Sequence, residues 1–258
     1  MAKKWTAFPH ASQSFAYDSA AIRKHWPRLH RGDTEPFPTD SQVLDAWRFH
    51  HAGDFQQAVA LGTAAGGAGI KAAVKAQVVY AQYLEKSAPA KLALLEQAYG
   101  WADAARKAAP KDANAHYLYA FALGRYGQGI SVAKALAQGF GGKIKEALTT
   151  AIALAPKHAE AHTAFGAYQS EVIDKVGALV AGMTYGAKKD SAIEHFETAL
   201  KIFPESPIAH MEHANGLLRL FGKARIDEAT RLYEAAAALR PMDAMERLDV
   251  ELAKSELD

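Results

Sequence analysis

Small and apolar side chains recur along this chain at spacings of three and four residues, and prolines interrupt the pattern at wide intervals. Residues 39–88, 111–155, 157–203 and 208–240 contain no proline, and each stretch is long enough for two helices. Spacings of three and four place side chains on one face of an α-helix, whereas proline ends a helix far more readily than it lies inside one. The pattern therefore predicts pairs of helices separated by proline-containing turns.

Four prolines mark equivalent turns, because each follows a similar stripe of small and apolar residues. Pro110, Pro156, Pro204 and Pro241 are separated by 46, 48 and 37 residues, and intervals of this size are typical of helical repeats. The small side chains of each stripe would let a neighbouring helix approach closely. The stripes consist of Ala98, Ala102 and Ala105; Ile144, Leu148 and Ala151; Ala192, Phe196 and Ala199; and Ala229, Tyr233 and Ala236.

The expected elements form an N-terminal segment, residues 1–38, and a repeat region, residues 39–258. The first has a helix near 15–31 and then a loop. The second has helix pairs at 40–51 with 54–66, 69–86 with 90–108, 112–126 with 143–154, 158–172 with 189–202 and 206–221 with 226–239, and a last helix at 242–256. Alanine favours helices and β-branched residues favour strands, so 56 alanines against 30 valines, isoleucines and threonines also predict an all-helical protein.

The repeat resembles the tetratricopeptide repeat (TPR) over roughly residues 40–256. Ala46, Phe49, Gly53 and Ala58 match the middle of the TPR pattern, and the last two stripes with their prolines match its end. The resemblance implies an all-α, right-handed α-solenoid of about five TPR-like helix pairs with N-terminal and C-terminal capping helices. The last helix would cover the open apolar end of the stack.

Charge and composition exclude several function classes. The formal net charge is only +2, and the 30 basic and 28 acidic side chains are interspersed, so we expect no nucleic-acid partner. The sequence has no cysteine, which excludes disulfides, thiolate metal sites, a cysteine nucleophile and a lipid-anchored cysteine within it.

The hydrophobic runs are too short for a membrane protein. The longest stretch without Asp, Glu, Lys or Arg is residues 55–70, whereas a spanning helix needs about 20 apolar residues. The positively charged start, Met1–Trp5, is not followed by the apolar run of a signal peptide. We therefore expect no membrane span and a cytoplasmic location.

Two insertions lengthen their repeats beyond the 34 residues of a plain TPR. They lie near residues 127–143 and 173–190, between the two helices of a pair, and they echo each other in sequence. One interpretation is that they extend the helices and pack on each other beneath the solenoid. A second is that they line a ligand pocket or partner surface, and a third is a membrane-dipping hairpin. Their most apolar members, which would need cover, are Val132, Leu136, Phe140, Leu179, Val180 and Met183.

The glycine-rich segments at residues 66–71 and 139–143 resemble phosphate-binding loops only superficially. A phosphate loop needs a strand before the glycines and a lysine directly after the last of them. Here a helix is predicted before each segment, so both are interpreted as connections between helices.

Histidine pairs are the strongest candidates for metal chemistry. His158 and His162 share a helix face, as two ligands would, but the sequence places no third ligand beside them. His162 also shares with His116 and His210 a position six residues after a proline, which favours a packing role. The same caution applies to His50-His51 and to His210 with His213. We expect no metal site and no cofactor, and since no catalytic motif stands on a recognisable scaffold, no enzymatic activity.

The TPR resemblance also implies where a partner would bind. In TPR proteins the first helix of each pair lines the concave groove, and this predicts a non-catalytic scaffold that binds a protein or peptide there. Arg125 and Arg219, on either side of Glu171, would hold an acidic peptide or form an internal ion pair. The predicted groove residues are Asn114, Tyr117, Phe121, Arg125, Thr163, Glu171, Met211, Asn215 and Arg219.

Other functions stay open at this point. The alternative is a small-molecule or lipid-binding module whose pocket is formed by the two apolar insertions, and a third idea is a self-assembling scaffold. The chain resembles helical repeat subunits associated with solute transporters, although those are usually exported lipoproteins with an anchor cysteine. The insertions also resemble microtubule-dynamics-regulator-like repeat proteins, a likeness that transfers no function.

Overall fold

The computed structural model describes residues 5–10 and 15–258, and over these residues every regular element is a helix. Residues 1–4 and 11–14 lie outside the described residues, and with them most of the positively charged start considered above. Within the described part of the chain, no helix combines the length and apolarity needed to cross a bilayer.

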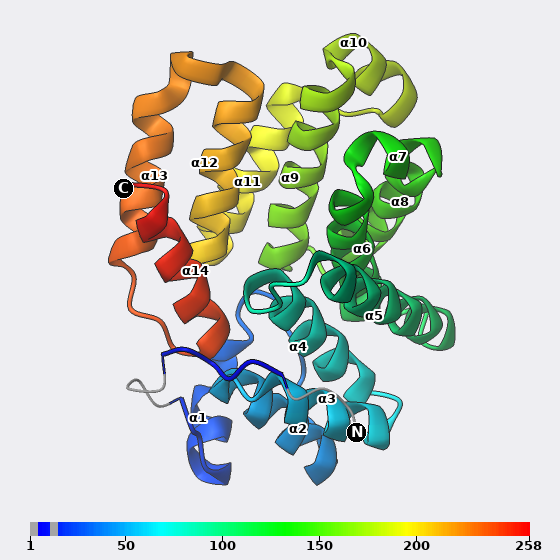
Figure 1. Cartoon of the computed structure of the whole chain (residues 1–258), viewed down its shortest axis with the longest axis vertical. Coiled ribbons are helices and arrows are strands. Elements are labelled where there is room, and N and C mark those ends of the chain that lie inside the picture. The colour runs from blue at the N-terminus through cyan, green and yellow to red at the C-terminus, as the bar shows by residue number, and fades with distance from the viewer. Residues whose placement is uncertain (1–4, 11–14) are drawn as a thin grey trace.

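Five helix pairs stack one after another to form an α-solenoid, as predicted (Figure 1). α1 (Ser19–Leu29) precedes the stack and α14 (Ala244–Ser255) follows it. The observed bounds lie within a few residues of the predicted ones except at the insertions. The pairs are α2 (Ser41–Ala52) with α3 (Phe55–Ala65), α4 (Gly69–Tyr83) with α5 (Ala88–Ala108), α6 (Ala113–Ile130) with α8 (Phe140–Leu154), α9 (Ala159–Val176) with α11 (Lys189–Ile202), and α12 (Pro207–Phe221) with α13 (Ile226–Ala238).

Side-chain caps set the starts of the helices. Asp40, Asp112 and Ser206 each accept a hydrogen bond from a backbone amide in the first turn of the following helix, which satisfies donors that have no partner within the helix. Asp18 does the same for α1, so α1 begins at Ser19 rather than near residue 15. Side-chain caps, His158 of α9 included, thus give four of the five pairs a defined start, whereas α4 begins at Gly69 without one.

The stripes predicted before the prolines form the contacts between helices. Ala192, Phe196 and Ala199 have no exposed surface. The ring of Phe196 fits between Gly166 of α9 and Gly216 of α12, where a Cβ atom on either glycine would press into it. Small residues therefore let three successive helices meet around one aromatic ring.

The recurring histidines have the packing role that the sequence predicted. In each of three turns, the histidine Nε2 donates a hydrogen bond to the carbonyl oxygen of the proline six residues earlier. The bond holds the turn against the first helix of the next pair. The three distances are 3.0 Å for His116 to Pro110, 3.2 Å for His162 to Pro156 and 2.9 Å for His210 to Pro204.

Both insertions extend the neighbouring helices. The first adds the short helix α7 (Val132–Ala137), and the second adds α10 (Ala178–Val180) and the π-helical turn η1 (Ala181–Tyr185). Tyr185 of the second insertion and Leu136 of the first both pack beside Gly141, so the insertions meet there, as the first interpretation predicts. A last short 3-10 segment, η2 (Gly222–Arg225), joins α12 to α13.

The expectation that all apolar insertion residues are covered is wrong for the second insertion. Leu179 is 76% exposed, Val180 48% and Met183 82%. Val132, Leu136 and Phe140 of the first insertion are half-buried. The difference arises because α10 protrudes at the end of α9 (Figure 1), whereas the end of η1, at Tyr185, turns back onto α8.

The C-terminal helix does more than cap the last pair. α14 packs on α12 and α13, as expected of a cap, but it also contacts α2 near the start of the stack (Figure 1). Its residues Ala244 and Leu248 share an apolar cluster with Phe55 of α3 and Val79 of α4. The curvature of the solenoid brings its first and last pairs close enough for a helix of about 18 Å to bridge them.

Candidate functional site

The first helices of four successive pairs line two adjoining cavities, which we call the central groove. α4, α6, α9 and α12 contribute to both cavities, and α14 lies along one side. The inner cavity has a volume of about 110 Å³. Its wall is mostly apolar and includes Val79, Ala120, Phe121, Ile144, Leu148, Ala164, Ala167, Tyr168, Ile208 and Met245.

Polar side chains surround the place where the two cavities join. Arg125 donates a hydrogen bond to Glu212 at 3.1 Å, and Gln128 donates to both carboxylate oxygens of Glu171 at 3.1 and 3.2 Å. Burial would lower the pKa of Arg125, but Glu212, Tyr83 and Glu171 together outweigh that effect and raise it, so the guanidinium stays charged. Gln82 adds an amide to the same rim.

The structure brings eight of the nine predicted groove residues to these cavities. The inner cavity has Tyr117, Phe121, Arg125, Thr163 and Glu171 in its wall. The outer cavity shares Arg125 and Glu171 and adds Met211, Asn215 and Arg219. The TPR resemblance therefore carried useful positional information, since these residues come from three different repeats.

Asn114 is the exception, because it lies below the groove. It is buried and donates a hydrogen bond to Glu35 at 2.7 Å, and it accepts one from His158 at 2.8 Å. His158 in turn caps α9 through the amide of Ala161. Both side chains thus hold the N-terminal segment against the repeats, and neither lines the groove.

The two arginines form an internal ion pair, one of the two expected arrangements, but with a different carboxylate from Glu171. Both guanidinium groups approach Glu212 instead, Arg125 at 3.1 Å and Arg219 at 3.7 Å. Sequence reasoning missed Glu212, although it stands seven residues before Arg219 on α12 and hence two turns away on the same face. That spacing was the available signal.

The N-terminal loop fills the other end of the concave face. The backbone amide of Glu160 donates to the carbonyl oxygen of Gly32 at 3.0 Å. Lys75 donates to Asp33 at 2.7 Å and to Glu160 at 2.8 Å. Burial would lower the pKa of Lys75, but the two carboxylates outweigh it and raise the pKa well above its ordinary value. This end of the face is therefore occupied by the chain itself.

A second buried ion pair fixes the same loop. Lys71 lies 2.8 Å from Glu35 and 2.7 Å from Asp112. Burial raises the pKa of Glu35 to about 7, against the opposing effect of Lys71. The sequence signal was the pair of lysines four residues apart within the otherwise apolar helix α4, together with Asp33 and Glu35 two residues apart in the loop.

The insertions contribute little to the groove. Among the described residues that line the cavities, two belong to the insertions. Gln128, at the start of the first insertion, lines both cavities, and Val132 lines the outer one. The glycine-rich segments are helix–helix connections, as predicted: Gly66 and Gly67 take positive φ between α3 and α4, and Gly139 takes positive φ before α8. The two cavities therefore lie between the first helices of the pairs and not between the insertions.

Comparison with solved structures shows the fold. The crystal structure of TTC0263, a thermophilic TPR protein of Thermus thermophilus, matches 83% of this chain and 98% of its own, with a TM-score of 0.57 and 17% identity. The structure of a monomeric IFIT1 mutant with Gppp-AAAA matches 78% of this chain and 50% of its own, with a TM-score of 0.44 and 17% identity. The TTC0263 likeness agrees with the predicted TPR-like α-solenoid.

Comparison by sequence identifies the family of the chain. No curated protein matches the chain. Residues 71–257 match the family model described as Regulator of microtubule dynamics protein 1-3. Because the match spans α4 to α14, well over half of the chain, this protein belongs to the family of regulator of microtubule dynamics proteins 1–3.

Proposed function

We propose that this chain is a non-catalytic scaffold that binds a protein or peptide partner in the central groove. The observation that carries the proposal is the inner cavity, an apolar hollow with a hydrogen-bonding rim on the face that the first helices of the repeats share. Apolar pockets with a few convergent polar groups are the usual form of recognition sites. The N-terminal loop and α14 restrict the open part of the face to this region.

The groove chemistry favours an extended segment with one apolar anchor. The cavity of about 110 Å³ accommodates a small apolar side chain. Gln82, Gln128 and Asn215 supply amides at the rim that can pair with a peptide backbone. Because Glu212 and Glu171 together balance the charges of Arg125 and Arg219, the groove gives no strong preference for an acidic peptide.

The family name directs the first choice of partner. Its members are described as regulators of microtubule dynamics, so tubulin polymer is the first probe. We expect purified chain to sediment with polymerised tubulin, and Ala167→Leu, which fills the inner cavity, to abolish this. Ala104→Leu, on an exposed position of α5, is the matched control and should sediment like the unmodified chain.

A peptide-display selection on the purified chain extends the test to other partners. We expect selected peptides to share an apolar residue and to lose at least tenfold in affinity with Phe121→Ala plus Arg219→Ala. If tubulin polymer does not bind and no displayed peptide depends on the groove, the proposal is wrong.

A small apolar ligand is the second candidate, because most of the cavity wall is apolar while Arg125 stands at its rim. This differs from the sequence-based alternative, which placed the pocket in the insertions. Native mass spectrometry distinguishes the two candidates: a small molecule that leaves on denaturation and is absent from Ala167→Leu supports the ligand.

The expectations of a cytoplasmic location and of no nucleic-acid partner stay predictions, to be checked by fluorescent tagging and by RNA and DNA titrations.

A further inference from the structure

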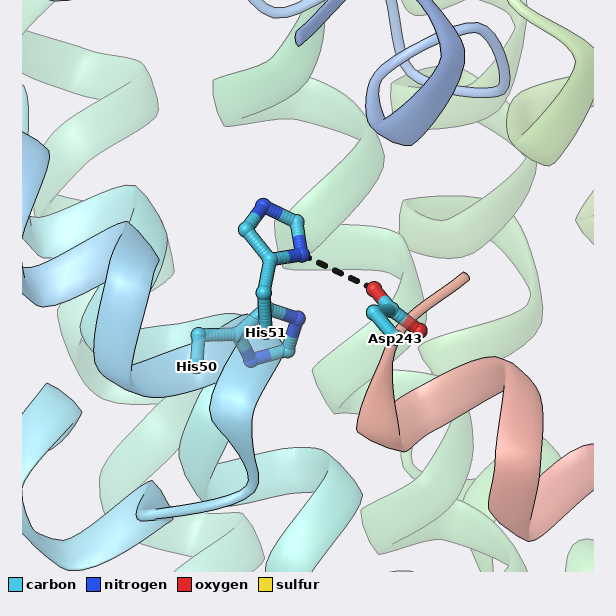
Figure 2. A group of neighbouring side chains, drawn as sticks. All are labelled: His50, His51 and Asp243. Atoms are coloured by element: carbon cyan, nitrogen blue, oxygen red, sulfur yellow. Dashed lines mark hydrogen bonds and ion pairs between the residues drawn. The ribbon is translucent and has the colours of Figure 1, made fainter. Parts of the chain in front are cut away.

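Three buried side chains outside the groove come together where the first repeat meets the last helix. His50 and His51 lie in the last turn of α2, and Asp243 is the N-cap residue of α14. One nitrogen of each imidazole and one carboxylate oxygen all lie within 4.8 Å of one another, in the group that Figure 2 shows. The three residues are 1%, 2% and 6% exposed.

His51 belongs to a line of contacts with a carboxylate at each end. Its Nδ1 lies 2.8 Å from Oδ2 of Asp243, and its Nε2 lies 3.2 Å from Nε2 of His30. The other nitrogen of His30, Nδ1, lies 2.9 Å from Asp33. The line therefore contains three contacts between two carboxylates and two imidazoles.

The number of hydrogens does not match the number of contacts. A neutral imidazole carries one N–H, so two imidazoles supply two hydrogens for three contacts. If His30 donates to Asp33 and His51 donates to His30, Nδ1 of His51 turns a lone pair toward the carboxylate of Asp243. Two electron-rich atoms at 2.8 Å then need a positive charge between them.

His50 is the third side chain of the group, and its ring also lacks part of its hydrogen bonding. Its Nδ1 is buried without a hydrogen-bond partner among the described residues, which costs stability unless something binds the ring. One nitrogen of the His50 ring also belongs to the group within 4.8 Å, so the cluster offers a third donor beside the His51–Asp243 contact. A proton satisfies only one contact, whereas a metal ion can use all three donors.

The surrounding contacts orient the donors as they do in metal sites. Metal-binding histidines usually donate their second N–H to a carboxylate or to another acceptor that fixes the ring, and His51 does so through His30 to Asp33. The second oxygen of Asp243, Oδ1, accepts from the backbone amide of Glu246 at 2.7 Å, which fixes the carboxylate.

We propose that His50, His51 and Asp243 bind a divalent transition metal ion, Zn²⁺ in the first place, which fastens α2 to α14. Two imidazoles and one carboxylate suit zinc, and a water molecule completes a tetrahedral set. The site departs from the expectation that the chain holds no metal. Its role is structural, because it is buried and joins the two ends of the solenoid.

Metal titration of the untagged full chain, freed of metal with a chelator, tests the proposal. We expect calorimetry with ZnCl₂ to show one ion per chain, and Co²⁺ to give the visible absorption of a tetrahedral nitrogen and oxygen site. His50→Phe removes one donor but keeps the His51–Asp243 contact, and it should weaken Zn²⁺ binding at least tenfold. His50→Gln is the second variant if the phenylalanine disturbs packing, which circular dichroism reports.

His213→Phe is the matched control, because His213 is also buried and both its ring nitrogens lack partners in the described part of the chain. It should bind Zn²⁺ like the unmodified chain. The proposal is overturned if the chain binds no ion, if His50→Phe keeps full affinity, or if ¹⁵N NMR of the metal-treated chain shows His51 as an imidazolium. The last result would mean that an extra proton fills the contact.

Discussion

Lys75 of α4 and Asp33 of the N-terminal loop form an ion pair of 2.7 Å with both side chains almost fully buried. The same ammonium group reaches Glu160 of α9 at 2.8 Å. Residues that are distant in sequence therefore share one charge in the interior, and the N-terminal loop is held on the concave face by electrostatics as much as by apolar contact.

Removal of the charge should destabilise the fold. Lys75→Met would leave Asp33 and Glu160 buried without a counter-ion, which typically costs about 3–5 kcal/mol. The measurement is urea denaturation at neutral pH. Lys107→Met, which breaks an exposed ion pair with Asp103, is the control and should cost less than about 1 kcal/mol. Equal losses of unfolding free energy in the two variants would show that the buried ion pair stabilises the fold no more than the exposed one.

The carboxyl group of Asp249 should make stability depend on pH. Burial raises its pKa from 3.8 to about 8, against the opposing hydrogen bond from Tyr83. The folded chain therefore keeps a proton that the unfolded chain loses, so the free energy of unfolding should fall as the pH rises from about 4 to about 8 and then level off.

Asp249→Asn isolates this effect, because an amide can still accept the hydrogen bond from Tyr83 but does not ionise. We compare the free energy of unfolding of the variant with that of the unmodified chain at each pH. This difference should favour the variant by about 2 kcal/mol or more at pH 8 relative to pH 4, since one pKa unit corresponds to about 1.4 kcal/mol. Asp227→Asn, an exposed position of α13, serves as the control. Parallel pH profiles for Asp249→Asn and the unmodified chain would contradict the argument.

Gly216 should be intolerant of a side chain. A Cβ atom there would press into the ring of Phe196, which is fully buried and has Gly166 on its other side. Gly216→Ala should therefore cost about 1–3 kcal/mol, as overpacked cores do. Gly100→Ala on α5, where a Cβ meets no atom within 4 Å, should instead stabilise by about 0.5–1 kcal/mol. Thermal unfolding of the two variants decides, and a stabilised Gly216→Ala would refute the packing account.

The helix pairs and their contacts could be predicted because they depend on local patterns. Ala192, Phe196 and Ala199 are three and four residues apart, so one helix must present them together. Eight of the nine groove residues reach the cavities for the same reason, since register along a first helix determines which face a residue occupies. The caps and proline turns are equally local, and they fixed most boundaries.

The polar interior could not be predicted, because it depends on the curvature of the stack. Asp33 meets Lys75 across 42 residues, and Lys75 meets Glu160 across 85. The contact of His51 with Asp243 spans 192 residues and exists only because α14 returns to the first pair. Charge spacing on α4 was visible in the sequence, but the partners that those lysines would find were not.

The histidines after the prolines should each stabilise their turn by one hydrogen bond. His116→Leu keeps much of the side-chain volume but removes the donor to the carbonyl oxygen of Pro110, and the loss should be about 1 kcal/mol. Hydrogen exchange should also show faster opening of the start of α6, because the bond holds that turn on the helix. His25→Leu, on α1 and outside the three turns, is the control for loss of an imidazole. If His116→Leu unfolds at the same urea concentration as His25→Leu and exchange at α6 is unchanged, the recurring histidine is a marker of the repeat and not a support of its turn.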